Sequence, residues 1–290
     1  MDPLSNLEMF TRQLLVLGPE AQEKLSSLDV LVAGCGALGT AILELLVRLG
    51  VGRIAVVDAD VIETSNLHRT HLFTLSDVGK PKALVCAQRA MEIGSGSKVT
   101  PILDIVDETN AESLVKGRDF VFDALDNVNP RLILNDACVK NGVPLIYGGV
   151  TGEYGSAMFV SPRDTPCLSC FMEPVEQADA CETMGTTAMT VSLVANLQVQ
   201  MMLNAIRGDI PRGLYYVDAR SLTLQAVDMK RNPSCEACSL GEYRYLKGIR
   251  MNCGLVRVNE RPPAGPRPYL KRTPDGLLIC YENCFKKIGR

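Results

Sequence analysis

The chain has 290 residues, 47% of them hydrophobic, and a net charge of −3, which suffices for one large core or a core with a small appendage. No apolar run approaches the roughly 20 residues of a membrane helix. The N-terminus also lacks a charged start followed by an apolar stretch, so we expect a cytoplasmic protein without a signal peptide. Residues 241–290 are rich in Lys and Arg, which leaves residues 1–240 acidic. An acidic body is a poor nucleic-acid binder, whereas the basic tail is either a contact for an acidic protein or a solvated terminus.

The first half of the chain alternates apolar runs with stretches of helical spacing. Apolar runs bounded by turn residues predict buried strands, and spacing of three and four predicts helices. We expect strands at residues 30–33, 53–57, 99–105, 120–124 and 144–147, and helices at residues 37–49, 81–93, 110–115 and 131–141. Such alternation predicts a doubly wound, mostly parallel, Rossmann-like α/β sheet with ligands above the carboxyl ends of its strands.

The pattern changes after Gly148-Gly149, where the parallel half should end. We expect an antiparallel strand, a loose polar stretch, a long helix, two strands with hairpin-like spacing and a C-terminal hairpin after a proline-rich run. These segments are residues 156–160, 171–183, 187–207, 214–218 with 222–228, and 269–281 after 261–268. The predicted division is a main domain over residues 1–240 and a basic tail over residues 241–290.

The first chemical signal is a glycine loop between a strand and a helix. Gly34, Gly36 and Gly39 stand in the G-x-G-x-x-G spacing that lets backbone N–H groups approach phosphate. Asp58, at the end of the second strand, is placed to accept hydrogen bonds from ribose hydroxyls. This motif does not distinguish NAD, FAD, S-adenosylmethionine and ATP, and it also occurs as a tight turn without a ligand.

Charged residues around the loop favour ATP. Arg69 and Lys82 follow the second strand, Asp126 follows the fourth, and Arg12 lies in the N-terminal segment. Carboxylates such as Asp126 and Asp60 can hold Mg²⁺, while the cations neutralise the phosphate charge that shifts when pyrophosphate leaves. Each residue alone is more often a surface ion pair or a helix cap, and only the combination favours the nucleotide.

The two histidines of the chain do not indicate a reaction that depends on a general base. The chain has only two, His68 and His71, and neither is required as a general base. A reaction whose nucleophile is already ionised needs no base, and a carboxylate that attacks the α-phosphate of ATP is such a reaction.

The second chemical signal is a pair of C-x-x-C knuckles. Cys167 and Cys170 pair with Cys235 and Cys238 in the layout of a tetrahedral Zn²⁺ site, which would be structural because four thiolates leave no open position. A redox-active C-x-x-C is the alternative. The high cysteine count favours metal ligands and thiol chemistry over disulfides. Cys35, Cys86 and Cys138 are then buried small hydrophobes, and Cys280 and Cys284 in the tail have no partner pair.

Taken together, these motifs resemble the ThiF/MoeB/HesA family, the relatives of ubiquitin-activating enzymes, over roughly residues 7–240. The series comprises the glycine loop, Asp58-Ala59-Asp60, Asn66 with Arg69, Lys82, Asp123 with Asp126, and the paired knuckles. The resemblance implies a homodimer that uses ATP and Mg²⁺ to adenylate the C-terminal glycine of a small ubiquitin-fold carrier ending in Gly-Gly. By position, it implies nucleotide and phosphate contacts from Asp58, Asn66, Arg69 and Lys82, and a magnesium-associated Asp126. It also implies that Arg12 reaches into the neighbouring subunit's ATP site.

Some features remain open within this resemblance. Arg69 is followed by Thr70 where the family commonly has a glutamine, and residues 241–290 match nothing familiar in it. Cys181 aligns with a cysteine that some members use to form a thioester or an acyl disulfide with the carrier, and a packing role is the alternative. Adenylation of a small-molecule, peptide or tRNA acceptor, and a nucleotide-binding scaffold without turnover, remain the competing functions. The identity of the carrier, and whether the product enters sulfur insertion or protein conjugation, are not encoded in these residues.

Overall fold

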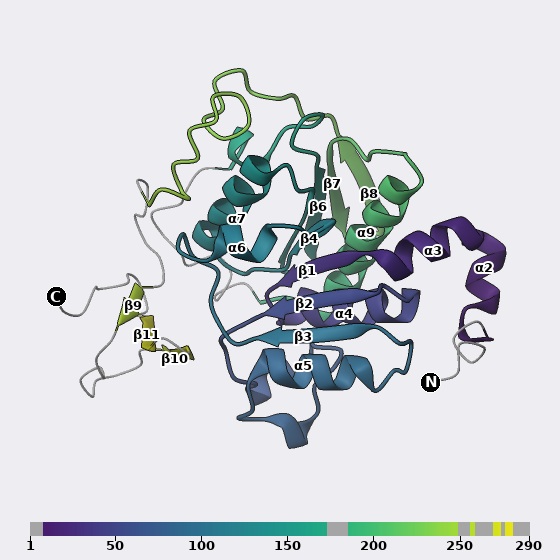
Figure 1. Ribbon diagram of the computed structural model, residues 1–290. Coiled ribbons are helices and arrows are strands. Elements are labelled where there is room, and N and C mark those ends of the chain that lie inside the picture. The colour runs from purple at the N-terminus through teal and green to yellow at the C-terminus, as the bar shows by residue number, and fades with distance from the viewer. Residues whose placement is uncertain (1–7, 173–184, 249–255, 259–268, 274–275, 281–290) are drawn as a thin grey trace.

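The computed structural model describes residues 8–172, 185–248, 256–258, 269–273 and 276–280. Eight strands form one sheet in the order β3-β2-β1-β4-β5-β6-β7-β8 (Figure 1). The strands are β1 (Asp29–Ala33), β2 (Arg53–Val57), β3 (Lys98–Ile102), β4 (Phe120–Asp123), β5 (Leu145–Thr151), β6 (Tyr154–Val160), β7 (Leu214–Asp218) and β8 (Thr223–Val227). The helices are α2 (Thr11–Leu17), α3 (Pro19–Ser27), α4 (Ala37–Leu49), α5 (Lys82–Met91), α6 (Ala111–Val115), α7 (Val128–Asn141) and α9 (Ala188–Ile206), with 3₁₀ turns η1 (Thr64–Asn66), η2 (Leu75–Asp77) and η3 (Leu168–Cys170).

The parallel half of the sheet confirms the predicted fold class. Strands β3, β2, β1, β4 and β5 run parallel. The chain order reverses between β1 and β4, because β2 and β3 extend to one side and β4 and β5 to the other. After β1 and β4 the chain leaves the sheet toward opposite faces, into α4 on one face and α7 on the other, and doubly wound folds bind ligands in the crevice at this point. The core side chains of these two strands are fully buried, which explains why their apolar runs were readable in the sequence.

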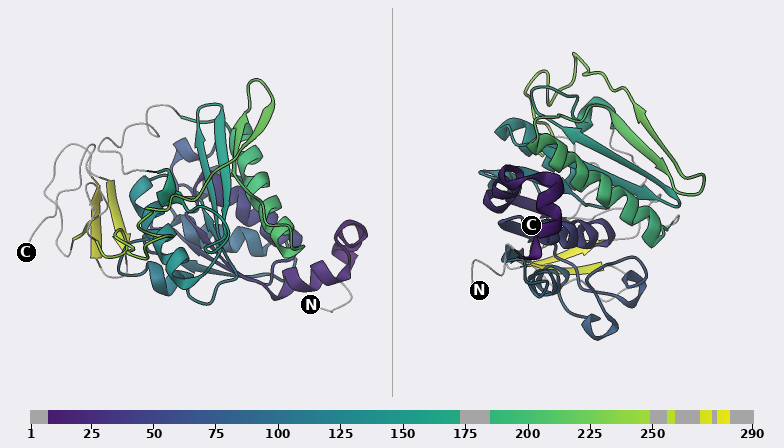
Figure 2. Two further views of the ribbon diagram at one scale, coloured as in Figure 1. Left: turned by 90° about the horizontal axis from the view of Figure 1, so that it is seen from above. Right: turned by 90° about the vertical axis from the view of Figure 1, so that its right-hand side faces the viewer.

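Helices cover both faces of the sheet (Figure 2). One apolar cluster joins the sheet to α4, α5 and α9 through residues such as Leu46, Val85 and Val194. The second cluster joins it to α6 and α7 through residues such as Leu114 and Leu132. The core is therefore divided by the sheet into two layers, as expected for a doubly wound fold.

Strand β5 does not end at the glycine pair as predicted, but runs through it to Thr151. A Cβ at Gly148 would lie 2.2 Å from Oε1 of Gln198, a buried side chain of α9. Glycine is thus needed here because a helix packs closely against the strand, and not because the strand stops. From β5 onward the pairing is antiparallel through β6, β7 and β8, as predicted.

The long helix α9 is apolar enough in composition to cross a membrane, with 19 residues and a mean hydropathy of 1.2. In the structure it lies across the sheet (Figure 2), where its residues Val191, Val194 and Met202 are buried in the core. Its composition is therefore explained by packing inside the fold. It begins after Thr187, whose hydroxyl accepts a hydrogen bond from the backbone N–H of Thr190.

Both ends of the chain add elements that the sequence pattern did not predict in full. Helices α2 and α3 precede β1 and were not predicted. At the other end, β10 (Tyr269–Thr273) and β11 (Gly276–Cys280) form the predicted antiparallel pair, and β9 (Val256–Val258) joins β11 to make a separate three-stranded sheet. The proline-rich run at 261–268, and Cys284, lie outside the described residues.

Candidate functional site

The loop between β1 and α4 holds three glycines in the close packing that a phosphate site requires. Gly34 has a φ of +95°, and a Cβ there would lie 2.6 Å from the carbonyl oxygen of Ala124. A Cβ at Gly39 would lie 2.0 Å from the carbonyl oxygen of Gly34. A Cβ at Gly36, in contrast, would meet no atom within 4 Å, and no side chain caps the first turn of α4. The N-terminus of α4 is therefore open for phosphate oxygens to approach.

Asp58 fixes this loop from the end of β2. Its Oδ2 accepts the backbone N–H of Cys35 at 2.7 Å, and its Oδ1 accepts that of Asp60 at 2.8 Å. A carboxylate oxygen accepts more than one hydrogen bond, so Asp58 can organise the loop and still receive the predicted ribose hydroxyls.

Lys82 is the cation that the structure places among the predicted acids. Its ammonium lies 3.1 Å from Asp60, and only 12% of its side chain is exposed. Desolvation alone would lower its pKa, but the negative charges of Asp58, Asp60 and Asp126 outweigh this and raise it. Lys82 is thus held as a cation at the carboxyl edge of the sheet, where the triphosphate of a nucleotide would lie.

Asp126 follows β4 on the same edge, and its side chain is exposed. The chain before it is bound to the glycine loop, since the N–H of Ala124 donates to the carbonyl of Ala33 at 2.9 Å. An exposed carboxylate next to a phosphate-binding helix end is a suitable oxygen ligand for Mg²⁺. Asp60 is less available for the metal because it already pairs with Lys82.

Asn66 is the last residue of η1, between β2 and α5, and Arg69 follows it by three residues. The side-chain Oδ1 of the buried Asn66 accepts the N–H of Glu63 at 3.0 Å, which closes the turn. The guanidinium of Arg69 donates to the carbonyl of Ser65 at 2.6 Å and lies 2.9 Å from Nε2 of His68. Within the described part of the chain it forms no ion pair with a carboxylate. Its charge is therefore not neutralised internally.

Arg12 is the predicted site residue that the structure places elsewhere within its own chain. It lies in α2, and the next residue, Gln13, donates to the carbonyl of Leu49 at 3.0 Å. Leu49 ends α4, whose beginning carries the phosphate site. At 1.5 Å per residue this helix is roughly 20 Å long. Helix α2, which contains Arg12, is thus attached at the end of α4 that is far from the glycine loop.

The four knuckle cysteines converge as predicted. Their sulfur atoms all lie within 4.8 Å of one another. Sγ of Cys167 is 3.7 Å from that of Cys235, and Sγ of Cys170 is 3.5 Å from that of Cys238. With Zn–S bonds of about 2.3 Å, tetrahedral ligation gives sulfur separations of about 3.8 Å, so this donor set fits zinc. The metal would join the segment after β6 to the segment after β8.

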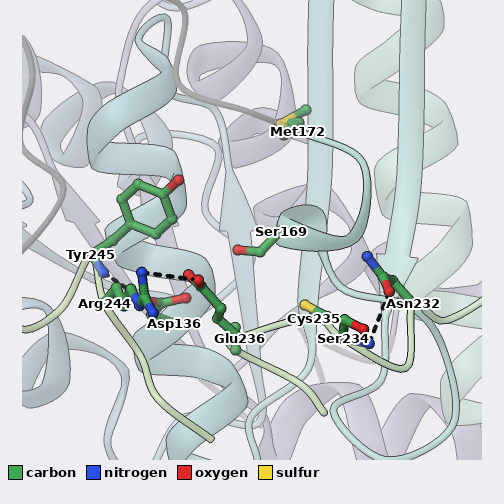
Figure 3. Close-up of a pocket in the computed structure, with 10 residues that line it drawn as sticks. Asp136, Ser169, Met172, Asn232, Ser234, Cys235, Glu236, Arg244 and Tyr245 are labelled. Carbon is green, nitrogen blue, oxygen red and sulfur yellow. Dashed lines mark hydrogen bonds and ion pairs between the residues drawn. The ribbon is translucent and has the colours of Figure 1, made fainter. Parts of the chain in front are cut away.

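A cavity of about 200 Å³ lies beside this cluster, and the knuckle residue Cys235 is part of its lining (Figure 3). Asp136 of α7 lines it, and its Oδ2 accepts the N–H groups of Tyr245 and Leu246 at 3.0 and 3.4 Å. Desolvation raises the pKa of Asp136 to about 6. Glu236 and Arg244, which also line the cavity, pair at 3.1 Å (Figure 3). These contacts attach residues 244–246 to α7 and to Glu236, close to the predicted boundary at residue 240.

The remaining cysteines differ partly from the sequence prediction. Cys35 and Cys86 are fully buried, as expected, but they form a disulfide and are not separate hydrophobes. The pair connects the glycine loop to α5, and its separation of 51 residues gave no signal in the sequence. Cys138 is a free buried thiol, whose pKa is raised by desolvation. Cys181, together with most of the predicted loose stretch, lies outside the described residues.

Sequence reasoning also missed a buried ion pair behind Asp126. Asp123 ends β4 and is fully buried, and its carboxylate lies 2.8 Å from Nε of Arg131 in α7. The available signal was a carboxylate as the last residue of an apolar strand, followed eight residues later by an arginine among apolar neighbours.

Comparisons with known proteins agree with this geometry. The ThiF family matches residues 10–237. The sulfur carrier protein ThiS adenylyltransferase of Bacillus subtilis is 36% identical over 82% of this chain and 73% of its own length. The SAMP-activating enzyme E1 of Haloferax volcanii is 35% identical over 84% and 93% of the two chains. Among solved structures, E. coli MccB with MccA-N7isoASN superposes with a TM-score of 0.71 at 22% identity, covering 79% of this chain and 74% of that one, which is a likeness of fold alone.

We expect one tightly bound zinc per chain, held by the four knuckle cysteines. Cys170→Ser should lose most of the metal and lower the thermal midpoint of the second half, because a structural site needs all four thiolates. Elemental analysis with a thermal melt measures both effects. Cys138→Ala, which removes a thiol outside the cluster, should keep the zinc. Freshly purified wild-type protein with much less than one zinc per chain would contradict the assignment.

Proposed function

The chain belongs to the ThiF family, and we propose that it uses ATP to adenylate the C-terminal glycine of a ubiquitin-like or sulfur-carrier protein, with release of pyrophosphate. The observation that carries this proposal is the position of Lys82 among three carboxylates beside an open helix N-terminus. A binding scaffold would not require a buried cation at this edge. Relatives that are at least 30% identical over most of their length, and that are named for sulfur carriers or for SAMP, favour a protein acceptor over a small molecule or tRNA.

The proposed reaction needs no general base. The carrier's terminal carboxylate is ionised at neutral pH and attacks the α-phosphate of ATP in line with the departing pyrophosphate. Lys82 and Arg69 would stabilise the charge that moves onto the β- and γ-phosphates. A Mg²⁺ ion held by Asp126 would supply further charge neutralisation on the same phosphates. His71 is already engaged, with Nδ1 3.1 Å from Glu44 and Nε2 3.1 Å from Ser192, so it is not required in this scheme.

We further propose that the enzyme is a homodimer, in which Arg12 of each chain serves the nucleotide of the other. Support comes from the position of α2, which contains Arg12 and is attached at the end of α4 far from the chain's own glycine loop. The exposed apolar side chains of the neighbouring Leu15 and Val16 are compatible with a covered surface.

A covalent step can follow adenylation if Cys181 attacks the acyl adenylate to form a thioester, or takes part in an acyl disulfide. This proposal rests on the resemblance and on the position of Cys181 shortly before α9. The alternative is a cysteine that only packs against its neighbours.

Wild-type protein should exchange labelled pyrophosphate into ATP only in the presence of a Gly-Gly-ended carrier. Asp126→Ala should reduce this exchange by at least about 100-fold, because it removes the metal-side carboxylate. The exposed Asp209 offers a matched control, and Asp209→Ala should exchange like wild type. Full exchange by the Asp126 variant would refute the metal assignment.

The dimer proposal is tested by mixing two inactive proteins, Arg12→Ala and Asp126→Ala. If Arg12 acts across the interface, random exchange of subunits restores about a quarter of the sites, since each hybrid dimer holds one intact site. Pyrophosphate exchange is measured before and after subunit exchange, which native mass spectrometry verifies. A double variant carrying both changes, mixed with either single variant, should recover nothing. No recovery in the main mixture would place Arg12 in its own site or outside catalysis.

The Cys181 proposal separates adenylation from later chemistry. Cys181→Ser should retain pyrophosphate exchange, because the carboxylate attacks ATP before a thiol is needed, and should lose a thiol-sensitive adduct with the carrier. Non-reducing gels and intact mass spectrometry detect that adduct. Cys138→Ala should keep it. If wild-type protein forms no reducible adduct and the Cys181 variant completes the downstream reaction, the packing role stands.

A further inference from the structure

The Asp126 loop is held from behind by a buried network that the proposed chemistry does not use directly. The peptide of Leu125 is bound on both sides. Its N–H donates to Oδ1 of Asp123 at 3.0 Å, and its carbonyl oxygen accepts a short hydrogen bond from Nη2 of Arg131. Nε of Arg131 donates to the other oxygen of Asp123 at 2.8 Å. These three contacts close a ring around the residue that immediately precedes Asp126.

The same guanidinium also connects the ends of two neighbouring strands. Nη2 of Arg131 reaches the carbonyl of Gly148 in β5 at 3.3 Å, and its Cζ lies 4.8 Å above the ring of Tyr147. From the opposite face of the sheet, Gln198 of α9 donates to the carbonyls of Asp123 and Ile146 at 3.0 and 2.9 Å. The carboxyl ends of β4 and β5 are therefore fixed from both helical layers.

Stability alone does not account for an ion pair in this position. Asp123 is fully buried and Arg131 nearly so, and their desolvation offsets much of their mutual attraction. Apolar side chains of similar volume often give equal or greater stability. The planar guanidinium, however, has donors in a fixed fork that can serve a carboxylate and two carbonyls at once. A lysine ammonium is a single point and cannot span these acceptors.

We propose that Arg131 is a positioning residue, which, together with Asp123, orients the Leu125–Asp126 peptide so that the Asp126 carboxylate meets the metal-bound phosphates of ATP. The inference rests on the proposed function for its meaning in catalysis, but not for its test. Arg131 acts through Asp126 and does not touch the nucleotide. Its loss should therefore resemble a weaker form of the loss of Asp126.

The chain offers a matched control at the other edge of the sheet. Arg118 also pairs with a carboxylate, that of Asp29, and its Nε donates to the carbonyl of Leu114 at 3.2 Å. Asp29 begins β1, so this second clamp lies at the amino edge, far from the glycine loop. Arg131→Lys and Arg118→Lys make the same chemical change at opposite edges.

The test measures ATP binding by calorimetry in the full-length protein, with Mg²⁺ and with EDTA, so it needs no carrier. The ratio of the two dissociation constants reports how far Mg²⁺ strengthens ATP binding. In wild type this ratio should be large, and Asp126→Ala should abolish it. Arg131→Lys should reduce it roughly tenfold or more, because a misplaced carboxylate loses most of its interaction with the metal. Arg118→Lys should leave it unchanged, and adding Arg131→Lys to Asp126→Ala should cause no further loss.

A second variant protects the test against misfolding. In Asp123→Leu combined with Arg131→Met, the buried pair is replaced by apolar residues, which removes the uncompensated charge that a single substitution would leave. One zinc per chain and a cooperative melt establish that it folds, and its Mg²⁺ ratio should fall as in Arg131→Lys. If both variants fold and keep the wild-type ratio, Arg131 has no positioning role. If wild type binds Mg·ATP with a large ratio but exchanges no pyrophosphate with any Gly-Gly-ended carrier, the proposed function fails while this inference stands or falls separately.

Discussion

The structure depends on the close approach of the backbones that follow β1 and β4, the two strands between which the strand order of the sheet reverses. The end of β1 and the end of β4 are bound to each other through the N–H of Ala124 and the carbonyl of Ala33. Only a residue without a side chain fits at Gly34 and at Gly39, because a Cβ at either position would overlap backbone atoms. This contact places the N-terminus of α4 beside the loop that carries Asp126. The charged residues of the candidate site lie around that crevice, so its geometry depends first on the close packing that the two glycines allow.

The charged side chains at the carboxyl edge of the sheet differ in how many partners they have within the chain. Lys82 is surrounded by carboxylates and stays a cation without a ligand. Arg69 binds only a backbone carbonyl and a neighbouring imidazole nitrogen among the described residues, so its charge is open to an anionic partner. Asp58 is occupied by the backbone, whereas Asp126 is exposed. Among the described residues the site thus offers one cation paired with a carboxylate, one cation without a carboxylate partner and one exposed carboxylate. This set suits a triphosphate with its metal better than the less highly charged pyrophosphate of a dinucleotide.

The parallel half of the sheet could be predicted from the sequence because its strands are buried on both faces and appear as continuous apolar runs. Residues that follow such strands must meet at one edge, which allowed Asp58, Lys82 and Asp126 to be assigned together. Errors arose where side-chain packing decided the structure. Gly148 and Gly149 looked like a strand end, but the glycine at 148 makes room for Gln198. The disulfide of Cys35 with Cys86 cannot be read from spacing, because it depends on a contact between segments that are distant in the chain.

Helix α7 shows why the buried polar contacts were hardest to predict. Residues 130–138 of this helix are all buried, and they include the polar side chains of Arg131, Asn135 and Asp136. Such a helix lacks the apolar stripe from which the buried face of a helix is predicted. Each of these side chains holds a different segment: Arg131 the Asp126 loop, Asn135 the N–H of Leu168 beside the first knuckle at 3.0 Å, and Asp136 the backbone at residues 245 and 246. One helix therefore connects the nucleotide edge to the cysteine cluster and to the start of the tail. Because unpaired polar groups in a core are costly, loss of any of these three contacts would destabilise the packing of α7. The geometry of the candidate phosphate site is in this way tied to the segments that the zinc would hold together.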